Sequence, residues 1–178
     1  VPLPLRVAPL PRETLPSFLS RLAAVNGAST TDFAVDMGFA FKRVLEMDEA
    51  AISDLATISG LSLGQLEALK SWTGVGVGNV RMAFRDEVFV SRALRNPKVR
   101  GCPLCLQEDA KAHRARPIEA MAMRGDWQFR EVSICVRHRH PLVQLWDVSA
   151  VSQRFDIGTQ LERIQDDIFS GNMDHPLI

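Results

Sequence analysis

Apolar residues at helical spacing run through the first part of the chain. Beyond a proline-rich stretch over residues 1–12, an apolar stripe predicts a helix over residues 14–26. The stripe consists of Phe18, Leu19, Leu22, Ala23 and Val25. Arg21 falls within this helix, where it could be a buried anchor; we expect exposure, which is commoner for arginine. A second, shorter helix is predicted over residues 31–37.

Residues 48–72 have the pattern of two short helices joined by a tight turn. Asp48 can cap the first helix and Gly60 can end it, while Ser62 and Gln65 form a capping box for the second. Such a pair is a helix-turn-helix, which in DNA-binding proteins places its second helix in the major groove. The second helix offers few base-reading side chains, so a plain packing unit stays open as the alternative.

Glycine alternates with valine over residues 74–78. A phosphate-binding loop would need a preceding strand and a lysine, and neither is evident here. We therefore expect a flexible connector, followed by a helix over residues 80–94.

All three cysteines fall in two short motifs, Cys102-Pro-Leu-Cys105 and Cys135-Val-Arg-His138. An odd number of cysteines argues against a disulfide framework, whereas three thiolates and one imidazole complete a tetrahedral zinc site. His140 is the alternative fourth ligand, but the repeated two-residue spacing favours His138, and we expect His140 to be partly exposed. Four protein ligands leave no open position on the ion, so we predict one structural Zn²⁺.

Charge is distributed unevenly along the chain, although its net charge is zero. Residues 92–140 carry 11 basic and 5 acidic side chains, and residues 141–178 carry 2 and 6. Basic clusters are typical of phosphate contacts, but a solvated face paired with the acidic end of the chain is the alternative. The candidate nucleic-acid contacts are Arg92, Arg95, Lys98, Arg100, Lys111, Arg114, Arg116, Arg137 and Arg139.

These patterns predict a mainly α fold with a small zinc module of the zinc-ribbon or treble-clef type. Residues 1–95 would form a helical domain that contains the helix-turn-helix, and residues 96–146 the zinc-binding module. Residues 147–178 would form a C-terminal helix and tail, the helix beginning with a capping box of Thr159 and Glu162.

The composition also narrows the class of protein. No apolar run reaches the length of a membrane span, and thiolate ligands suit a reducing cytoplasm. A hydrolytic zinc would need an open coordination position, and a nuclease would need clustered carboxylates. Neither is evident, nor is a nucleotide site, so we do not expect an enzyme.

Two groups of residues stand in a distinctive order along the chain. The first is Pro11-Arg-Glu13-Thr-Leu15, continued by Ser17-Phe-Leu19-Ser-Arg21-Leu22-Ala23. The second is Cys102–Leu106, Trp127, Cys135–His138 and Pro141-Leu142. Over about residues 9–145 this order resembles the opening and the central zinc pattern of the TniQ family of transposition proteins.

The resemblance implies a non-enzymatic accessory protein of a DNA transposon in the bacterial cytoplasm. Such proteins help to choose the insertion target and link target DNA, or a target-bound complex, to the ATPase regulator of the transposase. The implied partners are weakly or non-specifically bound DNA, the regulator and, as in some relatives, an RNA-guided CRISPR effector or a second copy of the chain. The alternative is a sequence-specific helix-turn-helix regulator with a structural zinc.

Overall fold

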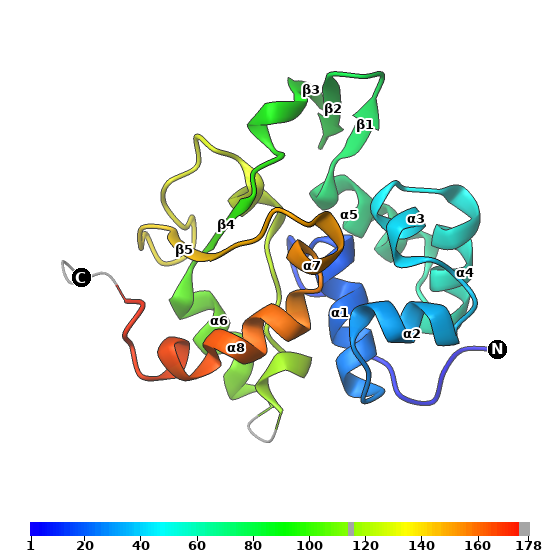
Figure 1. Cartoon of the computed structure of the whole chain (residues 1–178), viewed down its shortest axis with the longest axis horizontal. Helices are drawn as coiled ribbons and strands as arrows, with labels where there is room; N and C mark the ends of the chain where they lie inside the picture. The colour runs from blue at the N-terminus through cyan, green and yellow to red at the C-terminus, as the bar shows by residue number, and fades with distance from the viewer. Residues whose placement is uncertain (114–115, 175–178) are drawn as a thin grey trace.

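Helices of the N-terminal part enclose the first of two hydrophobic cores (Figure 1). The computed structural model describes residues 1–113 and 116–174. The helices are α1 (Leu15–Val25), α2 (Thr30–Asp36), α3 (Phe41–Leu45), α4 (Glu49–Ser59) and α5 (Leu63–Thr73). The helix predicted over residues 14–26 is confirmed, and Thr14 caps it by accepting a hydrogen bond from the N–H of Ser17.

The predicted pair of helices is present as α4 and α5. Asp48 caps α4 with its carboxylate, and Gly60 ends the helix in the left-handed region at φ 69°. At the start of α5, Ser62 and Gln65 form the predicted capping box. Local sequence signals therefore set both ends of the turn between the two helices.

A three-stranded antiparallel sheet follows α5, where the sequence predicted a connector and a helix. Its strands are β1 (Val75–Val77), β2 (Arg81–Phe84) and β3 (Glu87–Val90), in the order β1-β2-β3. Arg85 and Asp86 form the turn between β2 and β3, with φ of 46° and 70°. Two consecutive residues with positive φ are typical of a two-residue hairpin turn. The predictions for residues 74–78 and 80–94 were therefore wrong.

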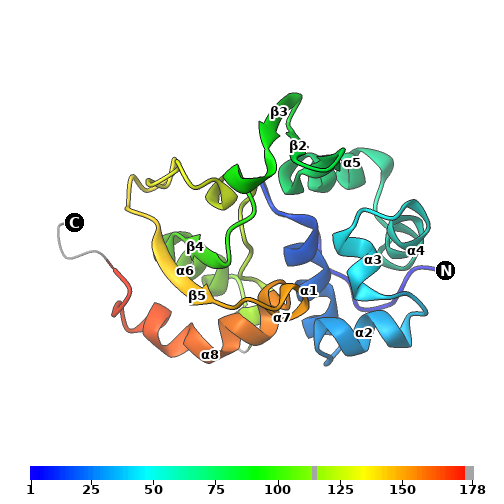
Figure 2. The same ribbon diagram turned by 45° about the horizontal axis from the view of Figure 1, so that its top comes forward.

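Aromatic packing holds one face of this sheet. Phe84 of β2 makes edge-to-face contacts with Trp72 and Phe129, at centroid distances of 5.9 and 4.8 Å. Phe89 of β3 contacts Phe129 in the same manner at 4.9 Å. Pairs of this kind contribute about 0.5–1.5 kcal/mol beyond the area that they bury. The sheet itself projects beyond α5 at one end of the molecule (Figures 1 and 2).

The second core surrounds the cysteine motifs. It is enclosed by α6 (Pro103–Lys111), α7 (Val151–Arg154), α8 (Ile157–Phe169) and an antiparallel pair of strands, β4 (Lys98–Gly101) and β5 (Val143–Asp147). Met121, Trp127 and Leu161 are among its buried side chains. Trp127 is 2% exposed and belongs to the same core as the three cysteines.

The helix α8 begins three residues earlier than the sequence predicted, with Asp156 and not Thr159 at the N-cap position. Ile157 is its first residue, so Thr159 and Glu162 do not form the capping box at its start. The carboxylate of Asp156 accepts hydrogen bonds from the hydroxyls of Thr30, at 2.6 Å, and Thr159, at 2.9 Å. The start of α8 is thus set by a contact with α2 that is remote in sequence.

The helix α1 lies between the two cores (Figures 1 and 2). It packs on α2 and α5 on one side and on α8 on the other. Its polar residues are buried and bind the second half of the chain. The hydroxyl of Ser17 accepts from the N–H of Met123 at 2.9 Å, and that of Ser20 accepts from the N–H of Ile157 at 3.1 Å.

Arg21 is buried in α1, which corrects the expectation of an exposed side chain. It is 6% exposed and forms an ion pair at 2.9 Å with Glu13, which is 1% exposed. Its guanidinium also donates to the carbonyl oxygens of Ala8 and Glu119, both at 3.1 Å. A buried guanidinium needs such partners, and here they come from three segments. No helix within residues 1–113 and 116–174 is both long and apolar enough to cross a membrane.

Candidate metal centre and basic surface

The four predicted ligands come together in one group. Cys102, Cys105, Cys135 and His138 offer ligand atoms that all lie within 4.8 Å of one another, and the three cysteines are buried. His140 is not in this group. It is buried at 1% exposure, so the expectation of a partly exposed side chain was wrong.

The first motif is held by the start of α6. Cys102 ends an extended stretch at φ −96° and ψ 113°, and Pro103 occupies the first turn of the helix, where its missing N–H costs no hydrogen bond. Cys105 follows within the same turn. This change from strand to helix brings both sulfur atoms to one side of the backbone.

The second motif is a tight turn between short extended segments. Ile134 and Pro141 form an isolated antiparallel bridge, and the N–H of Cys135 donates to the carbonyl oxygen of His140 at 2.8 Å. Arg139 adopts a left-handed conformation at φ 56°, and its N–H donates to the carbonyl oxygen of Cys135 at 2.8 Å. The turn thereby presents Cys135 and His138 toward the start of α6.

Four of the distances among the ligand atoms lie close to those expected around a tetrahedral zinc ion. With Zn–S of about 2.3 Å and Zn–N of about 2.0–2.1 Å, ideal geometry sets sulfur atoms about 3.8 Å apart and sulfur and nitrogen about 3.6 Å apart. The Sγ atoms of Cys105 and Cys135 are 3.6 Å apart. His138 Nδ1 lies 3.6, 3.3 and 3.9 Å from the Sγ atoms of Cys102, Cys105 and Cys135. Four such ligands would close the coordination sphere.

The pKa values of the two thiols of the first motif are shifted in opposite directions. A hydrogen bond from Cys105 lowers the pKa of Cys102 to about 5. The same contact, together with burial, raises the pKa of Cys105. The site therefore favours a thiolate at Cys102, and a bound divalent cation would displace the remaining thiol protons.

His138 is also held from outside the ligand group. Its Nε2 lies 2.9 Å from Oε1 of Glu108, on α6. The other oxygen of Glu108 lies 2.9 Å from Nη2 of Arg137. Glu108 thus joins the helix that carries Cys105 to the turn that carries His138.

Three of the predicted nucleic-acid contacts have partners within the protein. Arg100 is half-buried, and its guanidinium donates to the carbonyl oxygens of Phe129 and Arg130. Arg116 pairs with Glu119 at 3.0 Å, and Arg137 pairs with Glu108. Arg114 lies outside the described residues.

The other predicted contacts are exposed. Lys111 ends α6 and Arg139 directly follows the second motif, whereas Arg92 and Arg95 lie between β3 and β4 and Lys98 is the first residue of β4. We call residues 91–98 the basic strap. Among the described residues, no carboxylate forms an ion pair with these three side chains of the strap.

Sequence reasoning missed a fourth cation at the strap. The backbone N–H of Arg130 donates to the carbonyl oxygen of Ala93 at 3.0 Å, and its guanidinium donates to that of Arg95 at 3.3 Å. Arg130 is exposed and comes from a segment more than thirty residues later. Only its place in the basic part of the chain could have indicated a role at this surface.

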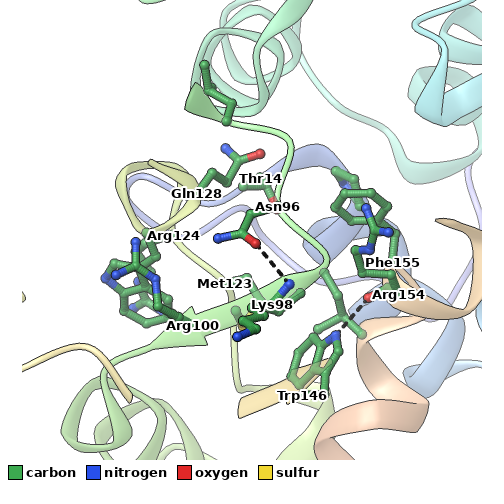
Figure 3. A pocket seen from close by; sticks show the side chains of 15 residues that line it. Thr14, Asn96, Lys98, Arg100, Met123, Arg124, Gln128, Trp146, Arg154 and Phe155 are labelled. Atoms are coloured by element: carbon green, nitrogen blue, oxygen red, sulfur yellow. Dashed lines mark hydrogen bonds between the residues drawn. The ribbon is translucent and has the colours of Figure 1, made fainter. Parts of the chain in front are cut away.

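A narrow, largely apolar cleft lies where the two cores meet (Figure 3). Trp146 and Phe155 line it, and Lys98, Arg100 and Arg154 stand around it. Its volume is about 50 Å³. Sites for drug-sized ligands usually measure about 300–1,000 Å³, and this cleft between the two cores is much smaller.

A family model described as TniQ matches residues 4–142. No curated protein matches the chain.

Proposed function

Because the chain belongs to the TniQ family, whose members are transposition-associated accessory proteins, we propose that it is a non-enzymatic adaptor in target-site selection. In this role it links target DNA, or a target-bound complex, to the ATPase regulator of a transposase. The family match carries the proposal, since it spans both the helical part and the cysteine motifs.

The metal in this proposal is a single Zn²⁺ with a structural role. The ligand distances and the closed set of three sulfurs and one nitrogen support zinc, which prefers such ligands in tetrahedral sites. Cys102, Cys105, Cys135 and Nδ1 of His138 would hold the ion. A closed site cross-links the protein and offers no position for a substrate.

The basic strap is the proposed contact with DNA. Arg92, Arg95 and Lys98 are exposed, and the guanidinium of Arg130 reaches the strap. Cations without carboxylate partners are suited to phosphate contacts, which need no base recognition. We further propose that α4 and α5 act as a helix-turn-helix whose part in DNA binding is secondary to the strap.

The outer face of the three-stranded sheet is the proposed binding surface for a protein partner. The strand register sets Val77, Val88 and Val90 on the face opposite Phe84 and Phe89, with the exposed Arg81 between Val77 and Val90. These valines are 47%, 58% and 51% exposed. The solvent face of an antiparallel sheet is usually polar, and an exposed apolar patch is typical of an interaction site.

DNA binding at several salt concentrations tests the proposal. We expect weak binding with little sequence preference in the parent protein. In the variant Arg92→Ala/Lys98→Ala, the slope of log K against log salt should fall by about 1.8, because each lost phosphate contact removes about 0.9. A matched control, Lys42→Ala/Arg163→Ala, removes two exposed cations outside the strap and should leave the slope unchanged.

Two outcomes would count against this account. Equal slopes for the strap variant and the control would remove the strap as the DNA contact. A preference for one sequence of about 10³-fold or more over others would instead indicate a sequence-specific helix-turn-helix regulator.

A further inference from the structure

His138 has two ring nitrogens, and the structure gives each a separate partner. Nδ1 faces the three sulfur atoms at 3.3–3.9 Å. Nε2 lies 2.9 Å from Oε1 of Glu108. A neutral imidazole carries its proton on one nitrogen only, so a ring that ligates through Nδ1 must carry the proton on Nε2. That proton then points at the Glu108 carboxylate.

Glu108 reaches this position from the same helix as the first motif. It lies one turn after Cys105 on α6, and residues three apart on a helix share a face. Its second oxygen accepts from Arg137, the residue before His138, at 2.9 Å. One carboxylate is therefore bonded to two consecutive residues of the second motif.

We propose that Glu108 is a positioning residue for the metal: it fixes the tautomer and the ring orientation of His138 and so sets how tightly the ion is held. This inference rests on the metal centre proposed above. Carboxylate partners of this kind orient a ligating imidazole and strengthen it as a ligand, and their loss typically weakens metal binding by about 10–100-fold.

A contribution to general stability does not explain the arrangement equally well. The side chains of Glu108 and Arg137 are 41% and 65% exposed, and exposed ion pairs contribute little to folding. The imidazole of His138 is only 16% exposed, so its N–H has few other acceptors. The effect of Glu108 should therefore be seen in the zinc affinity, while the fold of the zinc-loaded protein stays unchanged.

The test compares zinc affinity, by competition with a chromogenic chelator, in the full chain and three variants. Glu108→Ala removes the acceptor, and Glu108→Gln keeps an oxygen acceptor without the charge. Glu131→Ala is the control, because Glu131 is an exposed carboxylate of the same region with no ion pair to a described residue. We expect a loss of about 10–100-fold for Glu108→Ala, a smaller loss for Glu108→Gln and no change for the control.

A second measurement separates positioning from a loss of structure. In ¹⁵N spectra of the zinc-loaded parent, His138 should show a metal-bound Nδ1 and a protonated Nε2. Glu108→Ala should show mixed tautomers or faster zinc exchange while its circular dichroism stays that of the parent. Unchanged affinity, exchange and tautomer in Glu108→Ala would overturn the inference, and unfolding of Glu108→Gln would assign Glu108 a structural role instead. A parent protein that binds no zinc would refute the metal centre itself, which is a different result.

Discussion

Replacing Arg21 with methionine would test the link between the two cores. Methionine keeps much of the length of the side chain but removes the charge and the donors. Glu13 would then stay 1% exposed without the cation that now lies 2.9 Å away. Removing one partner of a buried ion pair costs about 3–5 kcal/mol, which is a large part of the 5–15 kcal/mol that stabilises a typical domain.

The loss of stability should also depend on pH. Burial raises the pKa of Glu13 above its ordinary value of 4.5, and the charge of Arg21 opposes this rise. Without Arg21 the folded-state pKa should rise further, so that folding favours the protonated acid. A raised pKa stabilises the fold fully below the unfolded-state value, and this contribution is lost as the pH rises through the folded-state pKa. The variant should therefore lose stability relative to the parent as the pH increases above 4.5.

Urea denaturation followed by circular dichroism at pH 5 and pH 8 measures both effects. The double variant Glu13→Gln/Arg21→Met should recover part of the loss and show little of the pH dependence, because its buried amide cannot ionise. Arg163→Met makes the same change at an exposed position of α8 and should alter the unfolding free energy by less than about 0.5 kcal/mol. A single variant that remains within about 1 kcal/mol of the parent at both pH values would refute this reasoning.

Two further predictions concern the metal and the sheet. Cys102→Ser should abolish stoichiometric zinc binding and the tertiary structure of the second core, and a chelator added to the parent should do the same. The reason is that structural zinc contributes about 10–16 kcal/mol in small zinc domains. A folded, zinc-loaded variant would show that the ligand assignment is wrong. Phe84→Ala should destabilise the protein by about 3–5 kcal/mol. It should also shift the fluorescence of Trp72, whose ring centroid lies 5.9 Å from that of Phe84. Val88→Ala, on the exposed face of the sheet, should have little effect on either measurement.

Features set by neighbouring residues were predictable from the sequence. The capping box of Ser62 and Gln65 needs only four residues in a row, and the structure contains it. The spacing of Cys102, Cys105, Cys135 and His138 likewise indicated one ligand group, which the structure brings together. In both cases the chemistry of the side chains restricts the backbone locally.

The sheet after α5 was not predictable in the same way. Its strands are only three or four residues long, and its turn uses Arg85 and Asp86 in place of the more usual Asn-Gly. Phe84 and Phe89 pack on Phe129, about forty residues later in the chain. Strand preference depends on such cross-chain packing, so the local pattern alone was misread as a helix.

The burial of polar side chains could not be predicted from the sequence for a related reason. Arg21 looks like an ordinary exposed arginine until Glu13 is brought back against α1 and the carbonyl oxygen of Glu119 approaches from the second half. His140 likewise becomes buried only when the second motif closes. Partners that are distant in sequence, and not residue type, decide whether such groups can leave water.

The position of α1 bears on how the protein can be divided. Ser17, Ser20 and Arg21 bind the backbone of Met123, Ile157 and Glu119, so residues near the start of the chain complete the surroundings of the cysteine motifs. A fragment that starts after α1 would expose those backbone groups and the apolar side chains of the second core that lie next to them. The half of the chain that carries the cysteine motifs therefore should not fold when it is excised or grafted without the first helix.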